Sequence, residues 1–249
     1  MQNGHEPVGQ AVVFGAGGMG RALVAALAAS GAYRKIHVGM RKPSVEWASP
    51  EWVSRIAPLP FDLLREETIA QAAGAIDGPV DLVLVTTGVL SDASLAVMPE
   101  KSIRAMDARA MAHVLAINTI GPALIAKHML PLLRRDRRAV FAALSARVGS
   151  LGDNRLGGWH SYRASKAALN MVLVNLSIEM ARTHPHAIIA GLHPGTVATD
   201  LSAPFQRGVA PDRLFLPERA ASCLLRVLDG LTQQDSGGVF AWDGQRLPW

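Results

Sequence analysis

Tyr162 and Lys166 carry a phenol and an ammonium that could take part in acid–base catalysis together. The chain has only two tyrosines and five lysines, and these two stand four residues apart in the segment YRASK. The alanine-rich segment that follows predicts a helix, on which residues four apart share a face. A neighbouring ammonium stabilises phenolate and lowers the pKa of a phenol from about 10. Such a phenol can protonate a carbonyl oxygen or deprotonate an alcohol. The alternative is a packed tyrosine beside a surface lysine.

A glycine-rich turn, GAGGMG, follows an apolar segment near the N-terminus and precedes a helical one. It fits the pattern G-x-G-x-x-G, in which glycines let the backbone approach a pyrophosphate and a helix N-terminus offers free N–H groups. The alternative is a plain tight turn. We take as cofactor-binding candidates Gly15, Gly17, Gly18, Met19 and Gly20.

The end of the second expected strand indicates which dinucleotide is bound. Sites built for NAD usually place an acidic residue here, whereas arginine accepts the 2′-phosphate of NADP. The segment VGMRKP has no acid and carries Arg41 and Lys42. We therefore expect NADP, with Arg41 gripping the phosphate and NAD the less favoured cofactor. Both cations could also be ordinary surface residues.

Two further loops follow expected strands. Asp62, which precedes Leu63, could accept a hydrogen bond from an adenine amino group, cap the next helix, or do both. Gly88 ends the segment TTG, where a small residue lets the backbone pass close to a cofactor. We expect Asp62, Leu63 and Gly88 to contact the cofactor.

Short strand-like segments alternate with longer helical ones along the chain. The expected strands are apolar throughout rather than alternating, which is typical of parallel strands covered on both faces. They span residues 10–14, 35–39, 57–59, 80–86, 139–144, 187–192 and 238–242. The expected helices span 21–30, 65–73, 105–133 with a possible break at Gly121-Pro122, 162–183 and 217–228. We predict an α/β fold: a single doubly wound Rossmann domain over residues 1–249, with a parallel sheet of about seven strands flanked by helices.

The composition narrows the class of protein. Hydrophobic residues make up 49% of the chain and charged residues 18%, with a net charge of +5. Cys223 is the only cysteine, and no cluster of cysteine and histidine indicates a metal. No apolar run reaches about 18 residues, and the N-terminus lacks the order of a signal peptide. We expect a cytoplasmic protein without a membrane segment, and we interpret the basic stretch 134–138 as a solvated turn rather than a nucleic-acid site.

Together these motifs resemble the short-chain dehydrogenase/reductase family over nearly the whole chain. The segments LSARVGS, DNRLGGW, YRASKAALN and GGVFAWDGQRLPW are similar to the bacterial C-factor group, which also resembles the sniffer-type carbonyl reductases. The resemblance implies an NADP-dependent enzyme that interconverts a carbonyl compound and an alcohol. The glycine turn is one residue shorter than the family's usual form.

The resemblance also implies catalytic roles. Tyr162 would protonate the carbonyl oxygen, and Lys166 would hold the nicotinamide ribose and lower the pKa of Tyr162. Asn118 would hold a water that links Lys166 to solvent; the alternative is a residue that satisfies backbone groups at a helix kink. The family's serine lies three residues before a glycine, where this chain has Ala146. We expect Ser145 to orient the substrate instead, with Ser150 as the other hydroxyl within reach.

The segment HPGTVATD looks like the family's loop near the nicotinamide. The residues that would line the nicotinamide and phosphate end are Pro194, Gly195, Val197 and Thr199. The substrate pocket would draw on Arg147, Leu151, Trp159, His160, Leu201 and Phe205.

Two functions from different classes remain open. The first is the NADP-dependent reductase of a small-molecule carbonyl, or the reverse oxidation of an alcohol. The second is a signalling or regulatory protein that binds the nucleotide without needing turnover. The apolar helices 105–133 and 162–183 predict a homodimer or homotetramer. The two tryptophans of the segment 242–249 predict that the C-terminal tail packs near the pocket.

Overall fold

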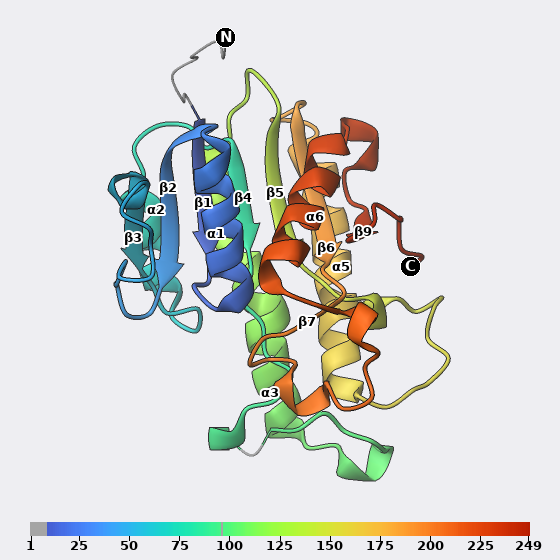
Figure 1. The fold of residues 1–249 in the computed structure, drawn as a ribbon. Helices are drawn as coiled ribbons and strands as arrows, with labels where there is room; N and C mark the ends of the chain where they lie inside the picture. The colour runs from blue at the N-terminus through green and yellow to red at the C-terminus, as the bar shows by residue number, and fades with distance from the viewer. Residues whose placement is uncertain (1–8, 96) are drawn as a thin grey trace.

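A seven-stranded parallel sheet forms the centre of the molecule (Figure 1). The computed structural model describes residues 9–95 and 97–249. The strand order is β3-β2-β1-β4-β5-β6-β9, and every pair in this sheet is parallel. Its strands are β1 (Gly9–Phe14), β2 (Tyr33–Met40), β3 (Ile56–Pro60), β4 (Leu82–Val85), β5 (Ala139–Leu144), β6 (Ala187–His193) and β9 (Val239–Ala241). The prediction of a doubly wound sheet of about seven strands is confirmed.

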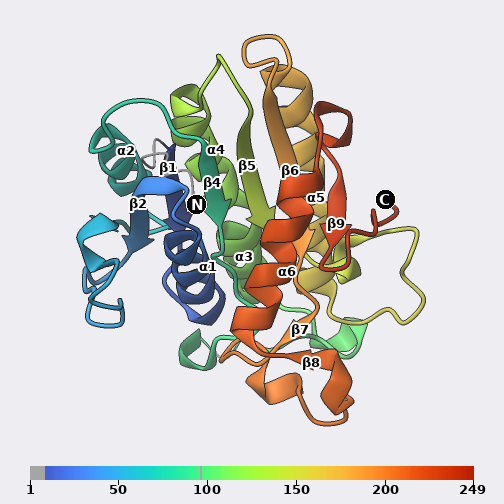
Figure 2. The same ribbon diagram turned by 45° about the horizontal axis from the view of Figure 1, so that its top comes forward.

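Helices cover both faces of the sheet. Two of them, α1 and α6, lie side by side on one face, and the others cover the opposite face (Figure 2). The helices are α1 (Gly18–Ser30), α2 (Glu66–Gly74), α3 (Ala108–Leu115), α4 (Gly121–Met129), α5 (His160–Met180) and α6 (Pro217–Gly230). A separate two-stranded ribbon pairs β7 (Thr196–Val197) with β8 (Leu214–Phe215).

Strand β1 shows why apolar residues follow one another along the strands instead of alternating with polar ones. All six of its residues are buried. Ala11 and Val13 belong to the core beneath α1 and α6, whereas Val12 and Phe14 belong to the core beneath α2, α4 and α5. Because successive side chains of a strand point to opposite faces, a strand between two cores carries apolar residues on both faces. Gln10 is the buried polar exception in β1, and its Nε2 donates to the Asp77 carbonyl oxygen at 2.7 Å.

A π-helical turn at Ala116–Ile120 joins α3 to α4. The sequence indicated a possible break at Gly121-Pro122, and the irregular turn ends directly before that pair. By length and composition alone, the stretch Ala108–Leu132 could cross a membrane, with a mean hydropathy of 1.3 over an 18-residue window. Its side chains Ile125, Ala126 and Met129 instead lie in the core against the sheet.

The carboxyl ends of all strands in the main sheet lie at one edge, at the lower end of the sheet in Figure 1. The chain order reverses between β1 and β4, so that the loops after these two strands diverge to opposite sides. Ligands of doubly wound folds bind in the crevice that such a reversal opens.

Candidate active site

A cavity of about 510 Å³ lies at the carboxyl ends of the strands. Most of the residues expected in the site line it: Gly17, Gly18, Met19, Gly20, Gly88, Ser145, Tyr162, Lys166, Pro194, Gly195, Val197 and Thr199. The lining does not include Gly15, Arg41, Asp62, Leu63 or Asn118. A second cavity, of about 570 Å³, lies between α6 and the C-terminal segment and holds none of these residues.

The glycine turn adopts a shape that other residues could not take. Gly15 has a φ of 108°, in the region that favours glycine, and a Cβ at Gly20 would lie 1.8 Å from the carbonyl oxygen of Gly15. Thr86, directly after β4, stabilises the turn. Its hydroxyl lies within hydrogen-bond distance of the carbonyl oxygens of Phe14, at 3.0 Å, and Gly15, at 3.1 Å. Thr86 was not among the residues expected to shape this turn.

The start of α1 fits the phosphates of a dinucleotide. Gly17 is its N-cap residue; no side chain caps the helix, and its first turn has no acidic residue. Nothing lies within 4 Å of the position that a Cβ of Gly17 would take, so the approach to the backbone is open. Free N–H groups and the positive end of the helix dipole together attract an anion. The buried Thr87 hydroxyl also has no partner among the described residues.

The expected adenine end of the site lies outside the cavity. Arg41 and Lys42 directly follow β2, and both side chains are exposed. Asp62 accepts a hydrogen bond from the Leu64 N–H at 3.0 Å, so one of its carboxylate oxygens caps a turn. Leu63 packs against Gly121, where a Cβ would come within 2.5 Å of its Cγ.

Tyr162 and Lys166 share one face of α5, but their pKa values differ from the sequence-based expectation. Burial raises the pKa of Tyr162 to about 12 and lowers the pKa of Lys166 to about 8. The Lys166 Nζ donates to the Leu144 carbonyl oxygen at 2.8 Å and lies 5.8 Å from the Tyr162 ring centroid. The expected lowering of the Tyr162 pKa is therefore wrong for this structure. Removal from water penalises both charged forms more than their proximity helps.

Asn118 joins the loop after β4 to α5. It is fully buried in the π-helical turn, and its Oδ1 accepts from the Val89 N–H at 2.8 Å. Its Nδ2 donates to the Val89 carbonyl oxygen at 2.8 Å and to the Ser165 hydroxyl at 3.0 Å. A Cβ added at Gly88 would lie 3.5 Å from Asn118 Oδ1 and 3.8 Å from Lys166 Nζ. These contacts place Asn118 beside Lys166 and Gly88.

The two candidate serines occupy different places. Ser145 lines the cavity, and its hydroxyl donates to Asn170 Oδ1 at 2.6 Å. Asn170 stands on α5 one turn beyond Lys166, a partner that sequence reasoning missed. The Ser150 hydroxyl accepts from the Asp153 N–H at 3.1 Å, and Ser150 is not among the residues that line the cavity. Ala146, in the family's serine slot, also lines the cavity.

Aromatic side chains form one wall of the cavity. The Trp159 ring meets the Tyr162 ring edge-on at 6.2 Å and the Phe205 ring at 5.3 Å, measured between centroids. Arg147 and Leu201 also line the cavity, whereas the other two expected pocket residues, Leu151 and His160, do not.

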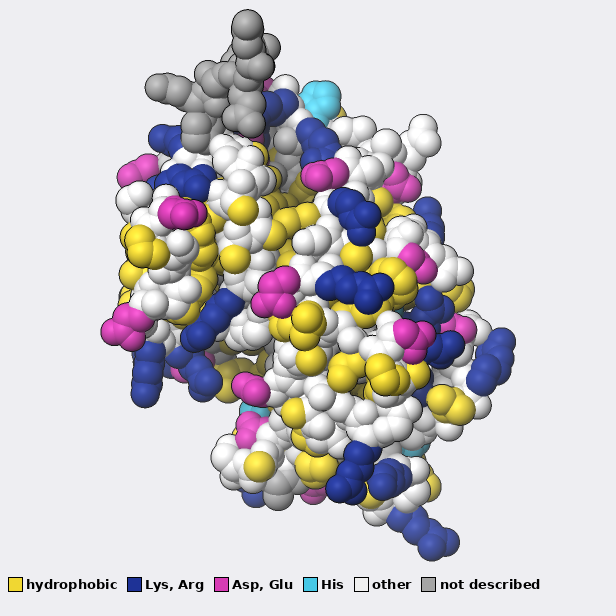
Figure 3. Space-filling model, viewed as in Figure 1, with side chains coloured by type: hydrophobic (Ala, Val, Ile, Leu, Met, Phe, Trp, Pro, Cys, Tyr) yellow, Lys and Arg dark blue, Asp and Glu magenta, His cyan; other side chains and the backbone are white. Residues whose placement is uncertain are grey.

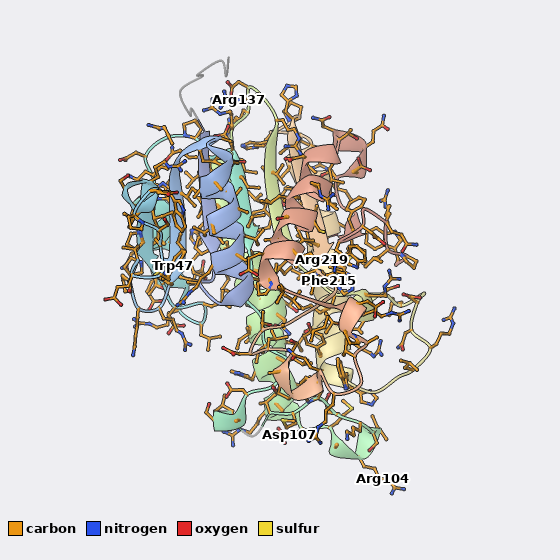
Figure 4. The ribbon with its side chains drawn as sticks, viewed as in Figure 1. Trp47, Arg104, Asp107, Arg137, Phe215 and Arg219 are labelled. Carbon is orange, nitrogen blue, oxygen red and sulfur yellow. The ribbon has the colours of Figure 1, made fainter. Side chains whose placement is uncertain are left out.

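The aromatic rings of Phe215 and Trp242 pack against the loop after β6. Arg219 of α6 lies over Phe215 (Figure 4), with its guanidinium carbon 4.3 Å from the ring centroid. Phe215 meets Trp242 edge-on at 4.7 Å between centroids. Both rings contact the position that a Cβ of Gly195 would take, and the φ of Gly195 is 78°. This packing leaves room only for glycine there.

His193 is a cavity residue that sequence reasoning did not single out. It ends β6, and its Nδ1 is buried without a partner among the described residues. Burial and then the nearby Arg147 lower the pKa of His193 to about 4, so the imidazole is neutral at pH 7. The available signal was its place directly before the Pro-Gly of HPGTVATD.

Comparisons with known proteins agree with this geometry. The family model for short chain dehydrogenases matches residues 10–209. The chain is 35% identical over 187 residues to the C-signal protein of Myxococcus xanthus, covering 72% of this chain and 99% of that protein. The structure resembles an NADPH-bound carbonyl reductase from chicken fatty liver, with a TM-score of 0.83, 25% identity and coverage of 97% and 99%. It shares the fold of the carbonyl reductase Sniffer of D. melanogaster, with a TM-score of 0.79, 22% identity and coverage of 98% and 100%.

Proposed function

The chain belongs to the short-chain dehydrogenase family of oxidoreductases, and we propose that it interconverts a small carbonyl compound and an alcohol with NADP(H). The observation that carries the proposal is the position of Tyr162. Its side chain lines the cavity, four residues before the buried Lys166 on α5, and the glycine turn before α1 lines the same cavity. A pure binding protein has no need for a phenol and an ammonium in this arrangement.

The residues of the chain would divide the work of reduction. A bound nicotinamide cofactor would supply the hydride. Tyr162 donates its phenolic proton to the carbonyl oxygen, and its raised pKa keeps that proton in place at pH 7. Lys166 stabilises the phenolate that forms and binds the ribose. Asn118 Oδ1 keeps one acceptor lone pair for a water next to Lys166.

Ser145 is the proposed hydroxyl for orienting the substrate. Its place in the cavity wall supports it over Ser150. Because a hydroxyl hydrogen rotates freely about the C–O bond, Ser145 can turn its proton from Asn170 toward a substrate oxygen. We also propose that Pro194, Gly195, Val197 and Thr199 line the nicotinamide end.

The preference for NADP over NAD rests on the acid-free end of β2. Arg41 and Lys42 stand exposed there, where a 2′-phosphate of the adenosine ribose would lie. Asp62 has one carboxylate oxygen committed to the Leu64 N–H, and the other would accept from the adenine amino group. The structurally similar carbonyl reductase from chicken fatty liver binds NADPH, which supports the same choice.

A signalling role is the second candidate, favoured by the 35% identity to the C-signal protein. Turnover separates the two. We expect the purified chain to oxidise NADPH with members of a panel of aldehydes and ketones, and Tyr162→Phe to lose that turnover while still binding NADPH in a fluorescence titration. Absence of turnover with the whole panel, or an undiminished rate in Tyr162→Phe, would contradict the enzyme proposal and leave the binding protein.

We also propose that the chain forms a homodimer or homotetramer in the cytoplasm and acts as one domain. Apolar side chains on the exposed sides of the helical layer support the contact: Ile120 is 54% exposed, Met171 60% and Ile178 57%. Burying them in a two-fold contact removes apolar surface from water. Light scattering that shows a monomer at micromolar concentration would contradict this assembly.

The surface charges are mixed in sign. On the face shown in Figure 3, basic side chains are scattered among acidic ones.

A further inference from the structure

A left-handed turn precedes the helix that carries Tyr162. Gly157, Gly158 and Trp159 follow one another with φ values of 62°, 65° and 49°. Trp159 is the one residue other than glycine with a positive φ in the described parts of the chain. This conformation costs a side-chain-bearing residue about 1–2 kcal/mol, so the surroundings of Trp159 must hold it in place.

Glu100 makes the contacts that hold this turn. It lies in the loop between β4 and α3, which reaches beneath the N-terminal end of α5 (Figure 1), and it is only 5% exposed. Its backbone carbonyl oxygen accepts from the Trp159 N–H at 2.5 Å. Its carboxylate accepts from the Ser161 N–H at 3.1 Å and from the Ser161 hydroxyl. Glu100 therefore accepts hydrogen bonds from the backbone N–H groups of both Trp159 and Ser161, at the start of α5.

The Glu100 carboxylate also caps the start of α5, which has no capping side chain of its own. Trp159 is the N-cap residue and provides no side-chain hydrogen bond, and the first turn of α5 contains no acidic residue. A carboxylate at this end satisfies free N–H groups and interacts favourably with the helix dipole. Burial pushes the pKa of Glu100 upward, but hydrogen bonds from Ser161 and from the backbone N–H of Glu100, together with the nearby His160, hold the pKa below its usual value. The group is thus ionised at pH 7.

The clamped residue is part of the cavity wall. Trp159 lines the cavity and places its ring against those of Tyr162 and Phe205. If the turn relaxed to negative φ, the indole would leave this position, because the direction of the Cα–Cβ bond depends on the backbone conformation. Glu100 itself is not among the residues that line the cavity, so it acts through Trp159.

We propose that Glu100 is a positioning residue: it clamps the left-handed turn so that Trp159 forms the wall against which an apolar, ring-bearing carbonyl substrate aligns with Tyr162. The proposal rests on the proposed carbonyl chemistry for its substrate, but the clamp itself does not. A substrate with an aromatic ring would bury that ring against the indole and gain from edge-to-face contact.

The first test measures the clamp without any turnover. Hydrogen exchange, followed by mass spectrometry, is compared for wild type, Glu100→Gln, Ser161→Ala and the control Glu67→Gln, whose carboxylate is exposed and pairs with Arg65. We expect exchange in residues 159–163 to rise on the order of 10-fold in the first two variants, since hydrogen bonds to a charged group are lost. The control should not change. Unchanged exchange in this segment, or an equal rise throughout the chain, would overturn the clamp.

The second test measures positioning. NADPH-dependent reduction of benzaldehyde and of acetaldehyde is compared in the same variants. We expect Glu100→Gln to raise the KM for benzaldehyde on the order of 10-fold while the KM for acetaldehyde stays close to wild type, because the methyl compound does not reach the wall. Equal losses for both would overturn the positioning role. If wild type reduces neither compound, the ring-bearing substrate is contradicted, while the exchange result still decides the clamp.

Discussion

Replacing Lys166 by methionine should stabilise the protein at neutral pH while removing a residue proposed for catalysis. Lys166 is 3% exposed, and burial lowers the pKa of its ammonium from 10.5 to about 8. That lowering corresponds to about 3 kcal/mol of destabilisation of the charged form, since one pKa unit is worth about 1.4 kcal/mol. Methionine has a similar length and carries no charge. It loses the hydrogen bond to the Leu144 carbonyl oxygen, worth about 1 kcal/mol. The net gain at pH 7 should be about 2 kcal/mol.

The sign of the pH dependence follows from the direction of the shift. The folded pKa of Lys166 is lower than the unfolded one, so the cost of the buried charge is present in full below pH 8. As the pH rises from about 8 toward 10.5, the folded state loses its proton before the unfolded state does, and wild type gains stability relative to the variant. The advantage of Lys166→Met should therefore shrink by about 2 kcal/mol between pH 7 and pH 9.5.

Urea unfolding at the two pH values, followed by tryptophan fluorescence, measures this difference. Lys127→Met is the matched control: the Lys127 side chain is 63% exposed, and its ammonium pairs with Glu66 on the surface. Its effect should stay within about 1 kcal/mol and be the same at both pH values. A stability difference between wild type and Lys166→Met that does not change with pH would refute the argument that burial lowers the pKa of Lys166.

Three further outcomes are expected. Arg41→Ala should weaken NADP binding by about 1–3 kcal/mol in calorimetry and change NAD binding little, because a charge-assisted contact to the 2′-phosphate is lost; equal loss for both cofactors would make Arg41 structural. Ser145→Ala should lower kcat by about 10²–10³, and Ser150→Ala far less, since only Ser145 lines the cavity; the reverse ranking would assign the role to Ser150. Deleting Arg246–Trp249 should lower the free energy of unfolding by about 2–4 kcal/mol, because Leu247 is 4% exposed and its N–H donates to the Val239 carbonyl oxygen; an unchanged melting temperature would show a free tail.

The sequence alone determined those features that depend on local periodicity. Continuous apolar runs predicted strands covered on both faces, and all seven expected strands occur in the sheet within about two residues of their predicted ends. The glycine turn between β1 and α1, and the shared face of Tyr162 and Lys166 on α5, follow in the same way from backbone geometry that a short segment specifies. The alternation of strands and helices along the chain predicted the parallel, doubly wound class of the sheet, whereas the order of its strands comes from the structure.

The burial of each site residue, and the distant residue to which it is hydrogen-bonded, depend on the packing of the whole chain. From the neighbouring Lys166 ammonium we predicted a lowered pKa for Tyr162. Burial by segments far along the chain instead raises the pKa of Tyr162 to about 12. Ser145 and Asn170 are 25 residues apart and Glu100 and Ser161 are 61 apart, and no local pattern connects either pair. Spacing along one helix or strand specifies direction and proximity within that element. Desolvation and hydrogen bonding between elements depend on how the whole chain packs, and that packing is settled only when the fold has formed.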